Sequence, residues 1–86
     1  SVTLSCRASG FTFAYYDILW YRRHSAGGSL EWVSFISPNS SVNKSEPAME
    51  GRALVSRDNS RSKSSLSLWA LGPRDSARYF CAISHG

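Results

Sequence analysis

The two cysteines constrain the fold of this chain more than any other feature of its sequence. Cys6 lies in the stretch LSCRASGFTF, and Cys81 lies near the other end, in DSARYFCAI. A structural zinc site needs close cysteine pairs and further ligands, and the histidines His24 and His85 lie too far apart to supply them. A reactive pair of Cys81 with His85 is an alternative, although no third group is present to orient it. A structural disulfide is the simpler interpretation.

A disulfide between Cys6 and Cys81 would close a loop of about 75 residues, worth roughly 4 kcal/mol in the chain-entropy description. The chain has 86 residues, the size of one small domain. At this size the hydrophobic core is marginal, so a covalent crosslink contributes much of the stability. Disulfides persist in oxidising compartments, and the sequence therefore predicts a protein that is secreted or exposed at the cell surface.

Composition and charge exclude several classes of function. The net charge of +4 is modest, and the Lys and Arg residues are scattered and form no basic stripe with interleaved aromatics. We therefore expect no nucleic-acid partner. No run of about eighteen apolar residues is present, so we expect no membrane contact by this domain. No nucleophile–base pair, phosphate-binding loop or metal-ligand cluster stands out, and we predict a non-enzymatic chain with no catalytic residue, metal or cofactor.

Short strands separated by turns account for most of the chain. Apolar residues alternate with polar ones from Val2 to Ala8, the period of a strand with one buried face. Residues 18–23 form a second strand, with Ile18 and Trp20 on one face and Leu19 and Tyr21 on the other. Further strands are expected at residues 30–37, 52–58, 65–71 and 77–83, and residues 38–47 read as a loop or irregular edge. This spacing predicts an all-β sandwich or barrel.

The order cysteine, tryptophan, cysteine selects among all-β folds. Trp20 stands in the second strand between Cys6 and Cys81, the layout of an immunoglobulin sandwich in which the tryptophan packs on the disulfide between the sheets. Tyr79 precedes Cys81 by two residues, where the tyrosine corner of that fold belongs. We therefore predict an immunoglobulin-like, V-type antiparallel β-sandwich with one inter-sheet disulfide.

Longer segments are similar to the heavy-chain variable domains of antibodies. The matching pieces are LSCRASGFTF, LEWVS at Leu30–Ser34, SRDNS at Ser56–Ser60 and DSARYFCA at Asp75–Ala82. They follow one another from end to end of the chain. The resemblance implies one variable domain over residues 1–86 that lacks the family's first and last strands. It also implies a salt bridge between Arg52 and Asp75.

Two core positions and one outward position between residues 53 and 69 depart from this family pattern. Ala53 and Ser64 stand where large inward apolar residues are expected, which predicts a thinner core. Trp69 stands at a usually polar, outward position. We interpret it either as an exposed aromatic or as part of a repacking that compensates for Ser64.

The resemblance implies antigen recognition by three loops at one end of the sandwich. Tyrosine offers rigid contact area and Ser and Asn offer adaptable hydrogen bonds, whereas Phe11 and Phe13 are expected to anchor the first loop. Asn39 and Asn43 each begin a sequon and are candidate N-glycosylation sites. The candidate antigen-binding residues are Ala14, Tyr15, Tyr16, Asp17, Phe35, Ser37, Asn39, Ser40, Val42, Lys44, Ile83, Ser84 and His85.

The resemblance also implies pairing with an immunoglobulin light chain, through apolar residues on the solvent side of one sheet. The candidate interface residues are Leu19, Tyr21, Arg23, Leu30, Trp32 and Phe80. Tyr21 departs from the usual valine, as in single-domain camelid chains, and Arg23 replaces a glutamine that normally bonds across the interface. The antigen is expected to be a protein or glycoprotein. The alternatives are a stand-alone single-domain antibody and a T-cell-receptor-like variable domain.

Overall fold

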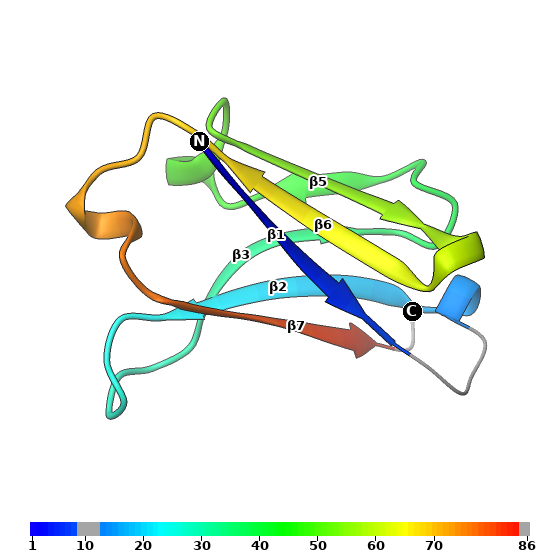
Figure 1. Cartoon of the computed structure of the whole chain (residues 1–86), viewed down its shortest axis with the longest axis horizontal. Helices are drawn as coiled ribbons and strands as arrows, with labels where there is room; N and C mark the ends of the chain where they lie inside the picture. The colour runs from blue at the N-terminus through cyan, green and yellow to red at the C-terminus, as the bar shows by residue number, and fades with distance from the viewer. Residues whose placement is uncertain (9–12, 85–86) are drawn as a thin grey trace.

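Two antiparallel sheets face each other in the computed structural model (Figure 1), which describes residues 1–8 and 13–84. One sheet has the order β1 (Val2–Arg7), β6 (Lys63–Leu68), β5 (Ala53–Asp58). The other has the order β4 (Asn43–Ser45), β3 (Glu31–Ile36), β2 (Asp17–Arg23), β7 (Arg78–Ser84). Short 3₁₀ turns lie between them: η1 (Phe13–Tyr15), η2 (Pro47–Met49), η3 (Asn59–Arg61) and η4 (Pro73–Asp75). The predicted all-β sandwich is confirmed.

The structure departs most clearly from the predicted strands at β6 and in the segment 38–47. β6 ends at Leu68, whereas the sequence predicted a strand to residue 71. Ala70 there has a φ of 53°, in the left-handed region that a strand cannot use. The segment expected to be a loop or irregular edge contains the three-residue edge strand β4, which pairs with the end of β3.

The disulfide joins the two sheets as predicted. Cys6 in β1 and Cys81 in β7 are bonded, with their Cα atoms 6.3 Å apart. Trp20 lies directly opposite Cys81 in the β2–β7 ladder and is 3 % exposed. Inward residues of both sheets surround it and form the core. The fully or nearly fully buried apolar residues are Phe13, Ile18, Trp20, Val33, Ile36, Met49, Val55, Leu66 and Leu68.

Ser64 makes hydrogen bonds at a core position where the family pattern has a large apolar side chain. Its side chain is fully buried, opposite Cys6. The Trp20 Nε1 donates to Ser64 Oγ over 3.2 Å, and Ser64 Oγ donates to the carbonyl oxygen of Ser56 over 2.8 Å. A buried indole N–H without an acceptor would cost about 1–3 kcal/mol. Ser64 therefore provides the hydrogen-bond acceptor for the buried indole N–H of Trp20 at the centre of the core.

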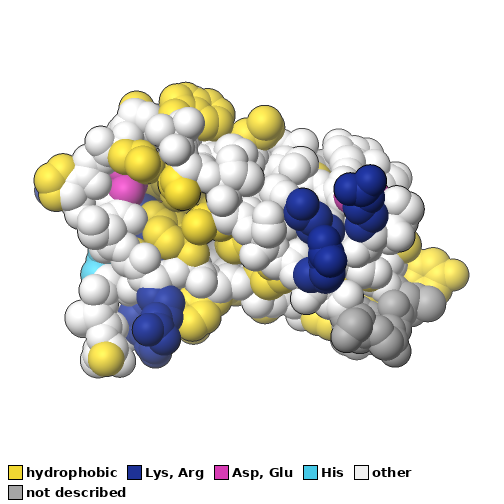
Figure 2. Space-filling view, viewed as in Figure 1, with side chains coloured by type: hydrophobic (Ala, Val, Ile, Leu, Met, Phe, Trp, Pro, Cys, Tyr) yellow, Lys and Arg dark blue, Asp and Glu magenta, His cyan; other side chains and the backbone are white. Residues whose placement is uncertain are grey.

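The side of the sandwich between β1 and β7 is open. A hollow of about 250 Å³ lies there, lined in part by Leu4, Leu68 and Tyr79, and Figure 2 shows hydrophobic side chains at the surface of this face. Val2 is 40 % exposed on this side, so the expectation that all apolar residues of the first strand are buried is wrong there. Trp69, just beyond the end of β6, is 38 % exposed and is thus an exposed aromatic.

A cluster of charges, defined by Arg22, Glu31, Glu46, Arg52 and Asp75, closes the sandwich beside η4. The predicted bridge is present, with Arg52 Nη1 2.9 Å from Asp75 Oδ2. Arg22 Nη1 lies 3.6 Å from the other oxygen of Asp75, and Arg22 Nε lies 3.2 Å from Glu31. The hydrogen bonds from Arg52 and from the Gly72 amide lower the pKa of Asp75.

The tyrosine corner also stabilises the η4 turn. The Tyr79 hydroxyl donates to the carbonyl oxygen of Asp75 over 2.8 Å, as its position before Cys81 predicts. Met49 is fully buried beneath the cluster, and both Arg22 and Arg52 donate to its sulfur, over 3.4 and 3.2 Å. This end of the sandwich is therefore fixed by charge-assisted hydrogen bonds in addition to apolar packing.

Candidate functional site

The strand register brings the three candidate loops to one end of the molecule. Asp17, where the first loop enters β2, pairs with Ser84, where β7 ends. Ile18 pairs with Ile36 at the end of β3, and Ile36 pairs with Asn43 beyond the second loop. The cysteine–tryptophan layout thus places loops that are far apart in sequence beside one another.

The first loop has a buried anchor and an exposed tip. Phe13 is 2 % exposed and belongs to the core, as expected of an anchor. The next residues turn outward: Ala14 is exposed, and Tyr15 is 74 % exposed. Tyr16 and Asp17 are half-buried. Phe11, the other expected anchor, lies outside the described residues.

Arg57 of β5 ties the first two loops together, a role that the sequence reasoning missed. Its guanidinium donates to the carbonyl oxygens of Phe13, Tyr16 and Ile36 over 2.9, 2.7 and 3.3 Å. It also lies over the Phe13 ring, 4.8 Å from the centroid. Burial lowers its pKa. The signal was available, because Arg57 follows the buried Val55 by two residues and so shares its inward face.

The second loop is a tight hairpin stabilised by its own side chains. The Ser37 amide donates to Val42 across its base, and the Ser41 amide donates to the side-chain oxygen of Asn39 over 3.0 Å. Ser40 at the tip has a φ of 64°. Asn39, Ser40, Ser41 and Val42 are exposed in this hairpin, and so are Asn43 and Lys44 at the start of β4. Both sequon asparagines are therefore exposed.

Ile83 and Ser84 were expected to begin the third loop, but they are the last two residues of β7, where they pair with Ile18 and Asp17. Ile83 is 45 % exposed and Ser84 is also exposed. His85 lies outside the described residues. The described candidates of all three loops therefore lie at one end and present mostly exposed side chains.

The outer face of the β4-β3-β2-β7 sheet carries the candidate pairing residues. Leu19, Tyr21 and Arg23 alternate with the buried residues of β2 and are half-buried themselves. Tyr21 pairs with Phe80 on one side and with Trp32 on the other. We call this surface the outer face.

An apolar hollow of about 280 Å³ lies on the outer face. Its lining residues are Tyr21, Arg23, Leu30, Phe80 and Ala82. Leu30, just before β3, is 58 % exposed at its rim. A hollow lined mainly by aromatic and aliphatic side chains is suited to receiving a side chain from another molecule.

Phe35 belongs to a strand and not to a loop. It lies in β3 opposite Leu19, with its ring centroid 6.4 Å from that of Trp32. The sequence grouped Phe35 with the antigen-binding residues, whereas the register places it on the outer face, where this face meets the loop end. It is half-buried.

Arg78 is a second residue that sequence reasoning missed. It starts β7 directly opposite Arg23 and is exposed. Its parity with Phe80, two residues further on, was the available signal that it shares the outer face.

The loops and the outer face offer surfaces for binding another molecule. Within residues 1–8 and 13–84, no group of three or more His, Cys, Asp and Glu side chains is placed to hold a metal ion. The same residues include no helix that is long and apolar enough to span a membrane.

Two sheets pinned by one disulfide over a buried tryptophan, with loops gathered at one end, define the variable-type immunoglobulin sandwich. The family model of the immunoglobulin V-set domain matches residues 1–86. The chain therefore belongs to the immunoglobulin V-set family. Domains of this family are generally non-enzymatic binding modules and are typically secreted or extracellular.

Proposed function

We propose that this chain is the heavy-chain variable domain of an antibody, which pairs with a light-chain variable domain through its outer face and binds antigen through its loop end. The observation that carries the proposal is the apolar hollow of Tyr21, Leu30 and Phe80. Apolar residues on the solvent side of a sheet mark a protein partner, because burying them stabilises a complex.

The loop end supports the antigen-binding part of the proposal. Tyr15 offers a large exposed aromatic surface, and the Asn39 and Ser40 tip offers polar groups on a hairpin fixed by its own hydrogen bonds. Rigid aromatic contacts combined with small polar ones suit protein recognition. Glycans on Asn39 or Asn43 would lie at the same end and would shield it or join the contact.

A stand-alone single-domain antibody is the second candidate. Tyr21 favours it, because a half-buried phenol in the middle of the outer face brings a hydroxyl where a partner would otherwise meet apolar surface. In that case the outer face would be exposed to solvent and the loops would bind antigen without a second chain.

Two exposed leucines permit a matched test of pairing. Leu30, on the outer face, is 58 % exposed, and Leu54, on β5 of the other sheet, is 59 % exposed. We would measure the native mass of the intact protein by light scattering and identify its chains by non-reducing mass spectrometry. We would then titrate each variant, Leu30→Glu and Leu54→Glu, with a light-chain variable domain.

We expect a second variable domain to co-elute with this chain. We also expect the affinity for the light-chain variable domain to fall about tenfold or more in Leu30→Glu and not in Leu54→Glu. A soluble monomer that does not bind the light-chain domain would overturn the pairing and favour the stand-alone binder. Equal losses in both variants would mean that the outer face is not the contact surface.

A further inference from the structure

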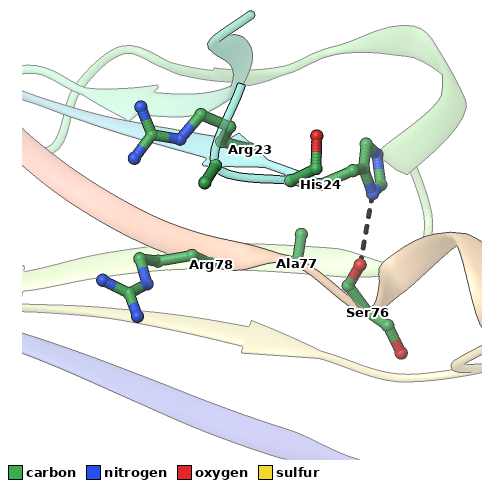
Figure 3. A pocket seen from close by; sticks show the side chains of 7 residues that line it. Arg23, His24, Ser76, Ala77 and Arg78 are labelled. Carbon is green, nitrogen blue, oxygen red and sulfur yellow. Dashed lines mark hydrogen bonds between the residues drawn. The ribbon is translucent and has the colours of Figure 1, made fainter. Parts of the chain in front are cut away.

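The end of the outer face next to the β2–β3 turn carries two arginines on neighbouring strands. Arg23 ends β2 and Arg78 begins β7, and they are paired across the ladder. Both line a cavity of about 440 Å³ whose remaining walls come from residues 24–26, 76 and 77. Figure 3 shows both guanidiniums extending in the same direction from their strands. The cavity is therefore a basic one.

Neither guanidinium is neutralised within the part of the chain that the structure describes. The ion pairs found there involve Arg22, His24, Arg52 and Arg61, and no carboxylate lies within 4.0 Å of Arg23 or Arg78. Glu31, beside this turn, bonds instead to Arg22 and His24. Like charges directly opposite each other in a sheet are destabilising. The isolated domain therefore carries a repulsion that an incoming negative charge would relieve.

His24 is already engaged, which leaves the two arginines as the available cationic donors of the cavity. Its Nδ1 donates to the carbonyl oxygen of Ser76 over 3.2 Å, which Figure 3 shows on the side away from the guanidiniums. Its Nε2 lies 3.2 Å from Glu31.

The basic cavity and the apolar hollow of the outer face are neighbours. Arg23 lines both, and its guanidinium lies over the Phe80 ring, 5.4 Å from the centroid. A partner that covers Tyr21 and Leu30 would thus also cover the arginines. Covering them removes water, which strengthens an ion pair and makes an unpaired guanidinium costly.

We propose that the partner of the outer face presents an Asp or Glu carboxylate to Arg23 and Arg78. This inference rests on the proposed pairing and deepens it, because it specifies the charge of the partner at one position. A guanidinium matches a carboxylate with two parallel hydrogen bonds, and no neutral side chain can compensate two such groups. The light-chain variable domain of the proposed pair therefore carries an acidic residue at the position that faces Arg23 and Arg78.

A second copy of this chain is the wrong occupant for the same reason. A symmetric dimer brings the same patch of both subunits together, which would gather the arginine pairs of both copies in one interface. Juxtaposed like charges suppress a wrong partner, so the arginines also favour a mixed pair over a self-pair.

The test uses one light-chain variable domain in three forms that differ only in the residue facing Arg23. That residue is Gln in the parent, and Glu or Lys in the variants. Affinity for the intact protein is measured by titration calorimetry at low and high salt. We expect the Glu form to bind about tenfold more tightly than the Gln form and the Lys form to bind more weakly, with the differences reduced by salt.

Variants of this chain assign the effect to the arginines. The double variant Arg23→Gln, Arg78→Gln should lose the preference for Glu and should self-associate more strongly than the wild type. Arg7→Gln, which removes an exposed arginine from β1 of the other sheet, should keep the preference.

Equal binding of the three forms would overturn the acidic partner and leave the pairing intact. A Glu preference that survives in the double variant would also overturn it. Failure of all three forms to bind would overturn the pairing and this inference together.

Discussion

Arg22 and Arg23 are adjacent in β2 and occupy opposite environments. Arg22 points inward, where its side chain is 11 % exposed and lies near the carboxylates of Asp75, Glu31 and Glu46. Arg23 points outward, stacks on Phe80 and has no carboxylate nearby in the described part of the chain. Both residues carry the same charge on the same strand, so the difference arises from strand parity and cross-strand neighbours alone.

This difference separates charges that hold the fold from charges that are available to a partner. Arg22 is largely shielded from water and is compensated by carboxylates of the same chain, so the loss of the buried Asp75 carboxylate removes part of that compensation. Arg23 and Arg78 both line the basic cavity, and Arg23 also lines the apolar hollow of the outer face. We expect changes in the charge cluster to affect stability, and changes at Arg23 to affect binding.

The largest effect is expected for Asp75→Asn. The carboxylate of Asp75 is 6 % exposed and accepts from both Arg52 and Gly72. The amide keeps the shape but leaves Arg22 and Arg52 without their shared negative charge. We expect a loss of about 3 kcal/mol in the free energy of unfolding, measured by urea denaturation.

Asp58→Asn is the matched control for that variant. Asp58 also pairs with an arginine, Arg61, but both side chains are largely exposed. Water screens such a pair, so the variant should unfold close to the wild type. If both variants lost the same stability, the distinction between internal and external charges would be wrong.

Acid should weaken the cluster in the same direction, with a smaller effect. Its neighbours lower the pKa of Asp75 in the folded protein below the ordinary value of 3.8. The unfolded chain therefore takes up the proton first, and the stabilisation, complete above that ordinary value, is lost as the pH falls through the lowered pKa. Urea titrations below pH 4 should show the wild type approaching Asp75→Asn. A constant difference between them would contradict the assignment.

The sequence predicted the frame of the molecule from a few residues with strong geometric requirements. Two distant cysteines, an intervening tryptophan and alternating strands led to the sandwich, and the bridge between Arg52 and Asp75 followed from the resemblance. These features are predictable because a strand places alternate residues on one face and a disulfide permits few separations.

The compensation at Ser64 could not be predicted in this way. Pattern reasoning treats a serine in the core as lost volume, whereas its hydroxyl meets an indole N–H from the opposite sheet. That contact depends on how β2 and β6 lie across the core, which the order of residues does not give. Val2 shows the same limit, because its burial depends on which elements cover the open side.

The sequence named candidate loop residues, but it did not identify the two arginines, Arg57 and Arg78, that lie beside the loops and on the outer face. Exposed loop residues could be named from the resemblance, but the contacts of Arg57 and the position of Arg78 opposite Arg23 depend on how distant segments lie together. From sequence alone, an arginine in a strand is interpreted as a solvated surface charge, because its neighbours across the sheet are unknown. Arg57 faces carbonyl oxygens of two loops, whereas Arg78 faces another arginine.

The smallest effect on stability is expected for Arg23→Gln, and its sign is opposite to that of Asp75→Asn. Removing one of two facing guanidiniums relieves repulsion with Arg78 and breaks no ion pair of the described residues. We expect the free energy of unfolding to rise by about 0.5 kcal/mol or less, and the gain to vanish at high salt. Arg22→Gln, one residue away, should instead destabilise strongly, because it removes the buried partner of Asp75 and Glu31. A large loss in the free energy of unfolding of Arg23→Gln would mean that Arg23 stabilises the fold and is not available to a partner.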